Sequence, residues 1–122
     1  MSATPGAFAQ PTKCKCYATK SLNGAFEPHE ITRRGCTDND VVIAVKYAGI
    51  CHSDIHTVKE EWGPVVFPIV PGHEIAGHVV AVGKNVNKFT VGQTVGVGCM
   101  VGSCSNCPSC LKGEEQWYDW YL

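Results

Sequence analysis

The sequence of 122 residues contains no apolar run that approaches the ~20 residues a helix needs to cross a membrane, so we expect no membrane partner. Charge is also scarce: charged residues make up 17%, the net charge is −1, and the lysines and arginines are scattered. This distribution argues against nucleic-acid binding. Residues 1–12 lack the basic and apolar regions of a signal peptide, and we expect them to form a flexible arm.

A glycine-rich phosphate-binding motif is missing too. No Gly-x-Gly-x-x-Gly follows a strand and opens a helix, although glycines are frequent at Gly92, Gly96, Gly98 and Gly102. The regular alternation of strands and helices that builds a Rossmann domain is absent as well. We therefore expect no dinucleotide-binding domain within these residues.

Short apolar segments separated by glycine and proline dominate the chain. Residues 40–47 alternate as a strand does, with Val45 and Tyr47 on one face and Ala44 and Lys46 on the other, which predicts heavier burial on one side. Further strands are expected at 74–82 and 94–97, weaker ones at 15–19 and 30–33, and one short helix at 53–59. Many short strands with glycine-rich turns predict a mostly β fold, either a barrel or a sandwich.

Eight cysteines would suit a secreted disulfide scaffold, but their spacing favours another use. Three of them form the tight pattern Cys104-x2-Cys107-x2-Cys110, which suits a metal ion better than disulfides. The implied compartment is reducing, and we expect the protein to be cytoplasmic.

A second group of metal-binding side chains surrounds Cys51 and His73. A catalytic zinc takes sulfur and imidazole ligands and keeps one position open, and these two residues supply such donors. Glu74 can bind the metal or lie behind it, and Asp54 can accept the ring N–H of a ligating histidine. Taken singly, a cysteine after a strand is usually a small buried residue, and a histidine beside glycine is often a turn residue. The combined string, by contrast, is highly specific.

The strings that carry this signal are Cys51-His52-Ser53-Asp54-Ile55-His56, Glu61-Trp62-Gly63, Val70-Pro71-Gly72-His73-Glu74-Ile75-x-Gly77 and Val95-Gly96-Val97-Gly98. In this order they resemble the N-terminal part of zinc-dependent medium-chain alcohol dehydrogenases. The similarity is greatest to the branch of cinnamyl-alcohol-dehydrogenase-like, NADP-preferring aldehyde reductases, and it covers residues 40–116. It implies a GroES-like β-barrel that carries the catalytic zinc and acts on alcohols and aldehydes.

The resemblance also implies roles for individual residues. Cys51 and His73 would bind the catalytic zinc, and Glu74 would be an adjacent, exchanging ligand. Ser53 would contact the zinc-bound alcohol and start a proton relay. His56 would pass the proton towards solvent, and His52 would lie near the pyrophosphate of the cofactor. Asp54 would support a zinc ligand, and Trp62 would line the substrate pocket. In the family a third zinc-binding cysteine lies further downstream, beyond these residues. We therefore expect a truncated barrel, inactive without a cofactor domain.

The three-cysteine lobe departs from the family pattern Cys-x2-Cys-x2-Cys-x7-Cys, which closes a structural zinc site. Here the fourth position is Tyr118, and a neutral phenol is a poor substitute for a thiolate. Cys104, Cys107 and Cys110 could still hold zinc with a water molecule or with Asp119. We divide the chain into an arm at 1–12, a GroES-like catalytic domain at 13–116 with the lobe at 98–116, and an atypical aromatic tail at 117–122.

Two other interpretations remain open. The chain could be a GroES-like module that binds zinc or a protein partner without catalysing a reaction. An iron–sulfur or redox lobe built on Cys104, Cys107 and Cys110 is the third possibility, and the Cys51 group disfavours it.

Overall fold

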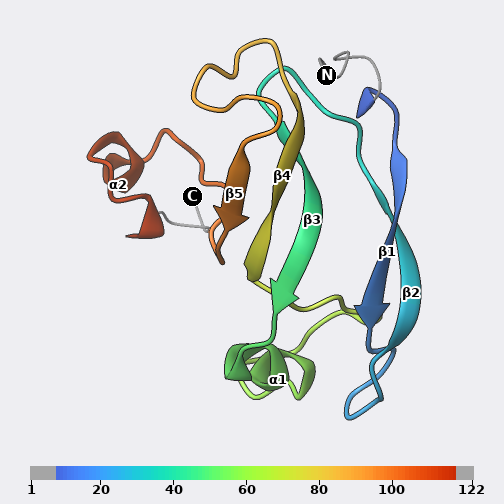
Figure 1. Cartoon of the computed structure of the whole chain (residues 1–122). Helices are drawn as coiled ribbons and strands as arrows, with labels where there is room; N and C mark the ends of the chain where they lie inside the picture. Colours follow the sequence, from blue (N-terminus) through green and yellow to red (C-terminus); the bar gives the residue numbers. More distant parts are fainter. Residues whose placement is uncertain (1–7, 118–122) are drawn as a thin grey trace.

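The computed structural model describes residues 8–117, which fold into two antiparallel sheets and a few short helices (Figure 1). The first sheet pairs β1 (Thr12–Ala18) with β2 (Glu27–Arg33). The second has the order β3-β4-β5, formed by β3 (Val41–Gly49), β4 (Glu74–Val82) and β5 (Thr94–Val97). The helical elements are α1 (His52–Val58), α2 (Pro108–Leu111) and the 3-10 turn η2 (Glu115–Trp117). The predicted mostly β fold is confirmed.

The predicted elements appear close to their expected positions. The strands expected at 74–82 and 94–97 match β4 and β5, and the helix expected at 53–59 is α1. The weaker candidate at 30–33 lies within the longer β2, and the one at 15–19 overlaps β1 but extends one residue past its end at Ala18. Residues 1–7 of the predicted arm lie outside the described part. The rest of the arm is ordered by contacts: the backbone N–H of Cys36 donates to the carbonyl of Phe8, and Thr12 already belongs to β1. In the part of the chain that the structure describes, no helix has the length and apolar character to cross a membrane.

Few apolar side chains of residues 8–117 are fully buried. Val79 and Ala81 lie on the same face of β4 and are 1% exposed, and the other two buried apolar residues in this range are Ala18 of β1 and Val58 of α1. Gly77 permits the close approach of β3, because a Cβ atom at this position would lie 2.4 Å from the carbonyl oxygen of Ala44. Thr19 and Ile69 exchange two backbone hydrogen bonds, which tie the end of β1 to the segment before β4.

The pairing of β3 with β4 positions the candidate site. The two strands are antiparallel, and the last residue of β3, Gly49, pairs with the first residue of β4, Glu74. Residues just after β3 and just before β4 therefore meet at the same end of the sheet. Helix α1 begins at this end, as Figure 1 shows. Cys51 and His73 flank these strand ends, so the topology brings them together.

A carboxylate organises the turn that leads into β3. Asp40 accepts hydrogen bonds from the guanidinium of Arg34 and from the backbone N–H and hydroxyl of Thr37, the last two at 2.7 Å. Its own carbonyl accepts the N–H of Gly83 at 2.8 Å. The guanidinium, followed by the two groups of Thr37, holds the pKa of Asp40 well below its usual range.

We expect Asp40→Asn to lower the free energy of unfolding by ~1 kcal/mol at neutral pH, because the amide loses charge-assisted hydrogen bonds at a partly exposed site. Since the pKa is depressed in the folded state, this contribution is present above the unfolded value of about 3.9 and is lost as the pH falls below it. Urea denaturation at neutral pH and at about pH 3 measures the difference.

The matched control is Asp38→Asn, which removes a carboxylate of the same turn that forms an exposed ion pair with Lys84. This variant should be nearly as stable as the parent, since exposed ion pairs contribute little. Equal stability of the two variants at neutral pH would contradict the role given to Asp40.

Candidate metal centre

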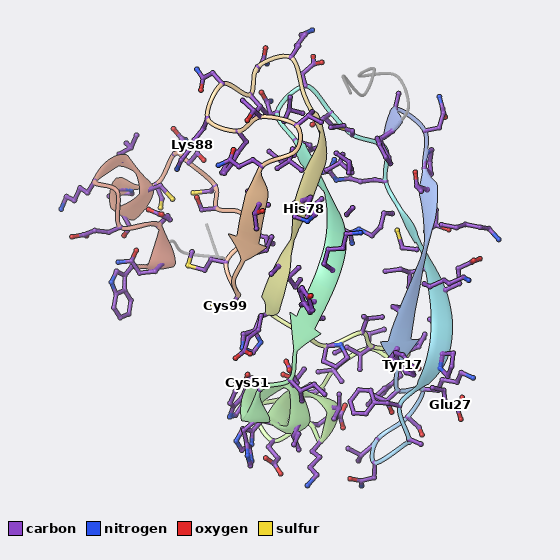
Figure 2. The ribbon with its side chains drawn as sticks, in the orientation of Figure 1. Tyr17, Glu27, Cys51, His78, Lys88 and Cys99 are labelled. Carbon is purple, nitrogen blue, oxygen red and sulfur yellow. The ribbon has the colours of Figure 1, made fainter. Side chains whose placement is uncertain are left out.

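Three donor groups of different chemistry converge at the end of the second sheet. The Sγ atom of Cys51, a ring nitrogen of His73 and a carboxylate oxygen of Glu74 all lie within 4.8 Å of one another. Cys51 is the residue before α1, beside the end of β3 (Figure 2), and the other two stand at the start of β4. A tetrahedral zinc with bonds of about 2.0–2.3 Å separates its donor atoms by about 3.3–3.8 Å. Small side-chain adjustments would bring the three donors to that spacing, so the residues present fit a zinc ion.

A buried carboxylate lies behind two of these donors. Asp54 is 7% exposed; one of its oxygens accepts the backbone N–H of Cys51 at 2.9 Å, and the other lies 3.2 Å from Nδ1 of His73. Nδ1 as the hydrogen-bond donor leaves Nε2 with a lone pair. The hydroxyl of Ser53 lies 3.3 Å from Nε2. One carboxylate therefore orients both the segment of Cys51 and the ring of His73.

The surroundings of Cys51 favour its thiolate form. The hydroxyl of Ser53, its backbone N–H and the imidazole of His73 lower the pKa of the Cys51 thiol. Contact with Cys51 in turn raises the pKa of His73; partial burial opposes this, and the charge of Asp54 adds to it. A zinc ion binds the deprotonated thiol, so this environment prepares Cys51 to act as a ligand.

A second set of side chains lies further along α1. The rings of His52 and His56 have centroids 4.6 Å apart at an angle of 44°, and the ring of His56 stacks on Trp62 at 4.9 Å. Nδ1 of His56 contacts the carboxylate of Glu61, and this contact lowers the pKa of Glu61. Trp62 is 68% exposed. The set forms an aromatic and charged surface next to the donor cluster.

The contact between His56 and Glu61 was missed by the sequence reasoning, which treated Glu61 only as part of a string. After α1, Glu60 adopts a positive φ of 58°, so the chain turns back and brings the next side chain to the helix. A left-handed glutamate is uncommon, and nothing in the residue types announces it. The Trp62-Gly63 pair is the one local signal that a turn lies there.

The three cysteines of the lobe also converge. Their Sγ atoms lie within 4.8 Å of one another, with 3.7 Å between those of Cys104 and Cys110. The N–H of Cys107, which precedes α2, donates to Cys104 Sγ at 3.4 Å. The hydroxyl of Ser103 lowers the pKa of Cys110, but burial and the neighbouring thiols outweigh it, so the net pKa is raised. Tyr118 and Asp119, considered for the fourth position, lie outside the described residues.

Comparison with known proteins identifies the fold. Residues 37–121 match the family model of the alcohol dehydrogenase GroES-like domain. The chain belongs to the zinc-dependent medium-chain alcohol dehydrogenases. The predicted GroES-like fold is thereby confirmed.

The relatives refine this placement. A probable cinnamyl alcohol dehydrogenase of rice is 52% identical over 105 residues, covering 86% of this chain and 30% of that protein. The NADP-dependent alcohol dehydrogenase C of Mycobacterium bovis is 55% identical over 101 residues, or 83% of this chain and 29% of the relative. The chain thus lies in the branch of this family that contains cinnamyl alcohol dehydrogenases and NADP-dependent alcohol dehydrogenases.

A solved structure agrees with the sequence relatives. The CAD of Helicobacter pylori, complexed with NADP(H), superposes with a TM-score of 0.86 at 45% identity, covering 89% of this chain and 31% of that one. The chain therefore spans about a third or less of the length of the relatives it matches.

Proposed function

We propose that this chain forms the zinc-binding catalytic portion of an NADP-dependent alcohol dehydrogenase or aldehyde reductase, which interconverts an alcohol and an aldehyde. The observation that carries this proposal is the convergence of Cys51, His73 and Glu74 on one small volume. When bound there, zinc would polarise a carbonyl oxygen or lower the pKa of an alcohol. The neighbouring side chains are suited to positioning the zinc ligands and to transferring protons.

The donor set leaves room for substrate. Cys51 and His73 supply two ligands and Glu74 an exchanging third, so a tetrahedral metal would keep a position for an alcohol or aldehyde oxygen when Glu74 withdraws, even with a further protein ligand bound. Gly49 allows the carboxylate of Glu74 to lie against the end of β3, since a Cβ atom there would stand 2.4 Å from Oε2. Asp54 holds the His73 ring and the Cys51 backbone in place. These contacts support a preorganised site.

Proton transfer falls to side chains of α1. We assign the Ser53 hydroxyl, beside His73, to the proton of the reacting alcohol, and His56 to its passage towards solvent. The carboxylate of Glu61 contacts Nδ1 of His56 and orients its ring, and the imidazole is a third exposed, which suits proton exchange with water. In this proposal His52 lies near the pyrophosphate of the cofactor, and Trp62 borders the substrate.

The cofactor brings the hydride, so the reaction needs more than these residues. The 122 residues contain no glycine-rich dinucleotide motif, and the relatives that they match are about three times longer. We propose that the chain by itself binds zinc but does not turn over alcohols, and that it acts when joined to a dinucleotide-binding domain. We also place it in the cytoplasm, a reducing compartment in which closely spaced thiols remain reduced.

A chimera tests this function. The matching segment of the Mycobacterium bovis NADP-dependent alcohol dehydrogenase C is replaced by the corresponding residues of this chain, and NADPH formation from a primary alcohol is followed. We expect turnover within about tenfold of the parent enzyme. Ser53→Ala in the chimera should lower kcat by about 100-fold, the usual contribution of a positioned proton-transfer group.

Thr57→Ala is a suitable control, since Thr57 lies on the same helix and its hydroxyl binds the carbonyl of Ser53 rather than the donor cluster. A chimera that folds, holds zinc and shows no turnover would overturn the proposal and favour the alternative, a module that binds zinc or a protein partner without catalysis.

A further inference from the structure

Within residues 8–117, the lobe around Cys104, Cys107 and Cys110 supplies three of the four ligands of a tetrahedral metal site. The three sulfur atoms are close enough to share one ion, and Cys104 is exposed while the other two are half-buried. Among residues 8–117, no histidine, aspartate, glutamate or further cysteine joins this group at the same spacing. The residue at the spacing where the family closes the site is Tyr118. The lobe therefore offers three thiolates for an ion that takes four ligands.

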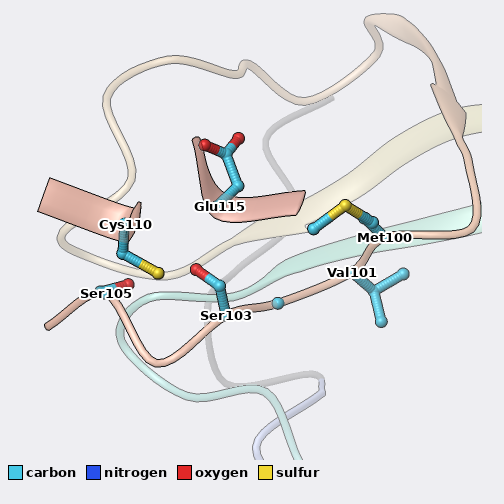
Figure 3. A pocket seen from close by; sticks show the side chains of 7 residues that line it. Met100, Val101, Ser103, Ser105, Cys110 and Glu115 are labelled. Carbon is cyan, nitrogen blue, oxygen red and sulfur yellow. The ribbon is translucent and has the colours of Figure 1, made fainter. Parts of the chain in front are cut away.

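A hollow adjoins the open cluster. It is lined by Met100, Ser103, Ser105, Cys110 and Glu115, together with Val101 and Gly102. Figure 3 shows the sulfur of Cys110 pointing towards Ser103 within this hollow. Its volume of about 470 Å³ far exceeds the roughly 30 Å³ that one water molecule occupies. A small molecule can thus reach the cluster from solvent.

We propose that this lobe is an open three-thiolate zinc site whose fourth ligand is a small-molecule thiol that enters through the hollow. Zinc is borderline soft, and a fourth thiolate completes the all-sulfur set that its closed sites commonly use. The incoming thiol binds as a thiolate and releases its proton to solvent. Because that ligand is not tethered to the chain, the ion exchanges faster than in a closed site. The inference is independent of the proposed dehydrogenase function.

Cobalt spectroscopy tests whether a thiol occupies the fourth coordination position of the lobe. In a Cys51→Ser/His73→Ala background only the lobe binds Co²⁺, and the visible absorption reports the ligands. Addition of millimolar 2-mercaptoethanol should shift and intensify the cobalt bands in a saturable manner. The variant Tyr118→Cys, which restores the four-cysteine pattern, should not respond and should release zinc to a chelator about 10- to 100-fold more slowly. Cys110→Ser should lose the cobalt signal.

The unaltered chain provides a second measurement, should the double variant fail to fold. Loaded with ¹¹³Cd, it should give two resonances, because sites with one and with three sulfur ligands differ in chemical shift. Only the sulfur-rich resonance should move when 2-mercaptoethanol is added. A lobe spectrum that does not change with thiol, or an equal response in Tyr118→Cys, would overturn the proposal.

Discussion

Cys51→Ser is expected to remove one zinc ion per chain, because the zinc affinity of the donor cluster of Cys51, His73 and Glu74 should fall by at least ~100-fold. The loss exceeds the 10- to 100-fold typical of groups behind the ligands, because a serine hydroxyl does not ionise near neutral pH and offers zinc no soft donor. The remaining donors, His73 and Glu74, are too few to hold the ion firmly. Zinc counting after gel filtration, together with a competition titration against a chelator, measures both effects.

The matched control is Cys16→Ser. Cys16 is another half-buried thiol, but it lies on β1, where it donates to the carbonyl of His29 at 3.5 Å. This variant should keep two zinc ions per chain, and far-ultraviolet circular dichroism should show that both variants remain folded. If Cys51→Ser retained zinc as tightly as Cys16→Ser, the donor cluster would not be a metal site and the proposed function would lose its basis.

Asp54→Asn is expected to lower the zinc affinity of the Cys51, His73 and Glu74 site by about 10- to 100-fold. The carboxylate accepts hydrogen bonds on both oxygens, one towards the N–H of Cys51 and one towards Nδ1 of His73. An amide has one acceptor oxygen, so one of these partners would face an N–H₂ group instead. The ring of His73 would lose its orientation, and the metal-free chain would become less stable by about 1–3 kcal/mol, since the side chain is buried.

Chelator competition and urea denaturation separate the two consequences. Glu61→Gln serves as the comparison, because it removes a nearby exposed carboxylate that contacts His56 rather than a donor of the cluster. Zinc affinity in Glu61→Gln should match that of the parent. If Asp54→Asn lowered stability but left zinc affinity equal to that of Glu61→Gln, Asp54 would be a structural residue and not a positioning residue of the metal site.

Much of the fold was predictable because the signals are local. Strand β4 carries β-branched residues between turns rich in glycine and proline, and the prediction of 74–82 coincides with Glu74–Val82. The prediction that one face of β3 is more heavily buried is wrong, because residues of both faces are half-buried at its start and exposed further along. The register shifts between Val45 and Tyr47, so Lys46 has no partner in the pairing with β4. The side chain of Val45 is 56% exposed and that of Tyr47 is 76% exposed. Such a bulge depends on the partner strand, which alternation within one segment does not report.

The residue types alone determined the chemistry available to this protein. Thiol, imidazole and carboxylate at Cys51, His73 and Glu74, and three closely spaced thiols in the lobe, are donors suited to zinc in any fold. Only the tertiary structure decided that the first set meets, because the antiparallel pairing of Gly49 with Glu74 places the end of β3 against the start of β4. It also decided that one carboxylate, Asp54, supports two donors, since a buried group finds its partners through packing and not through its place in the chain.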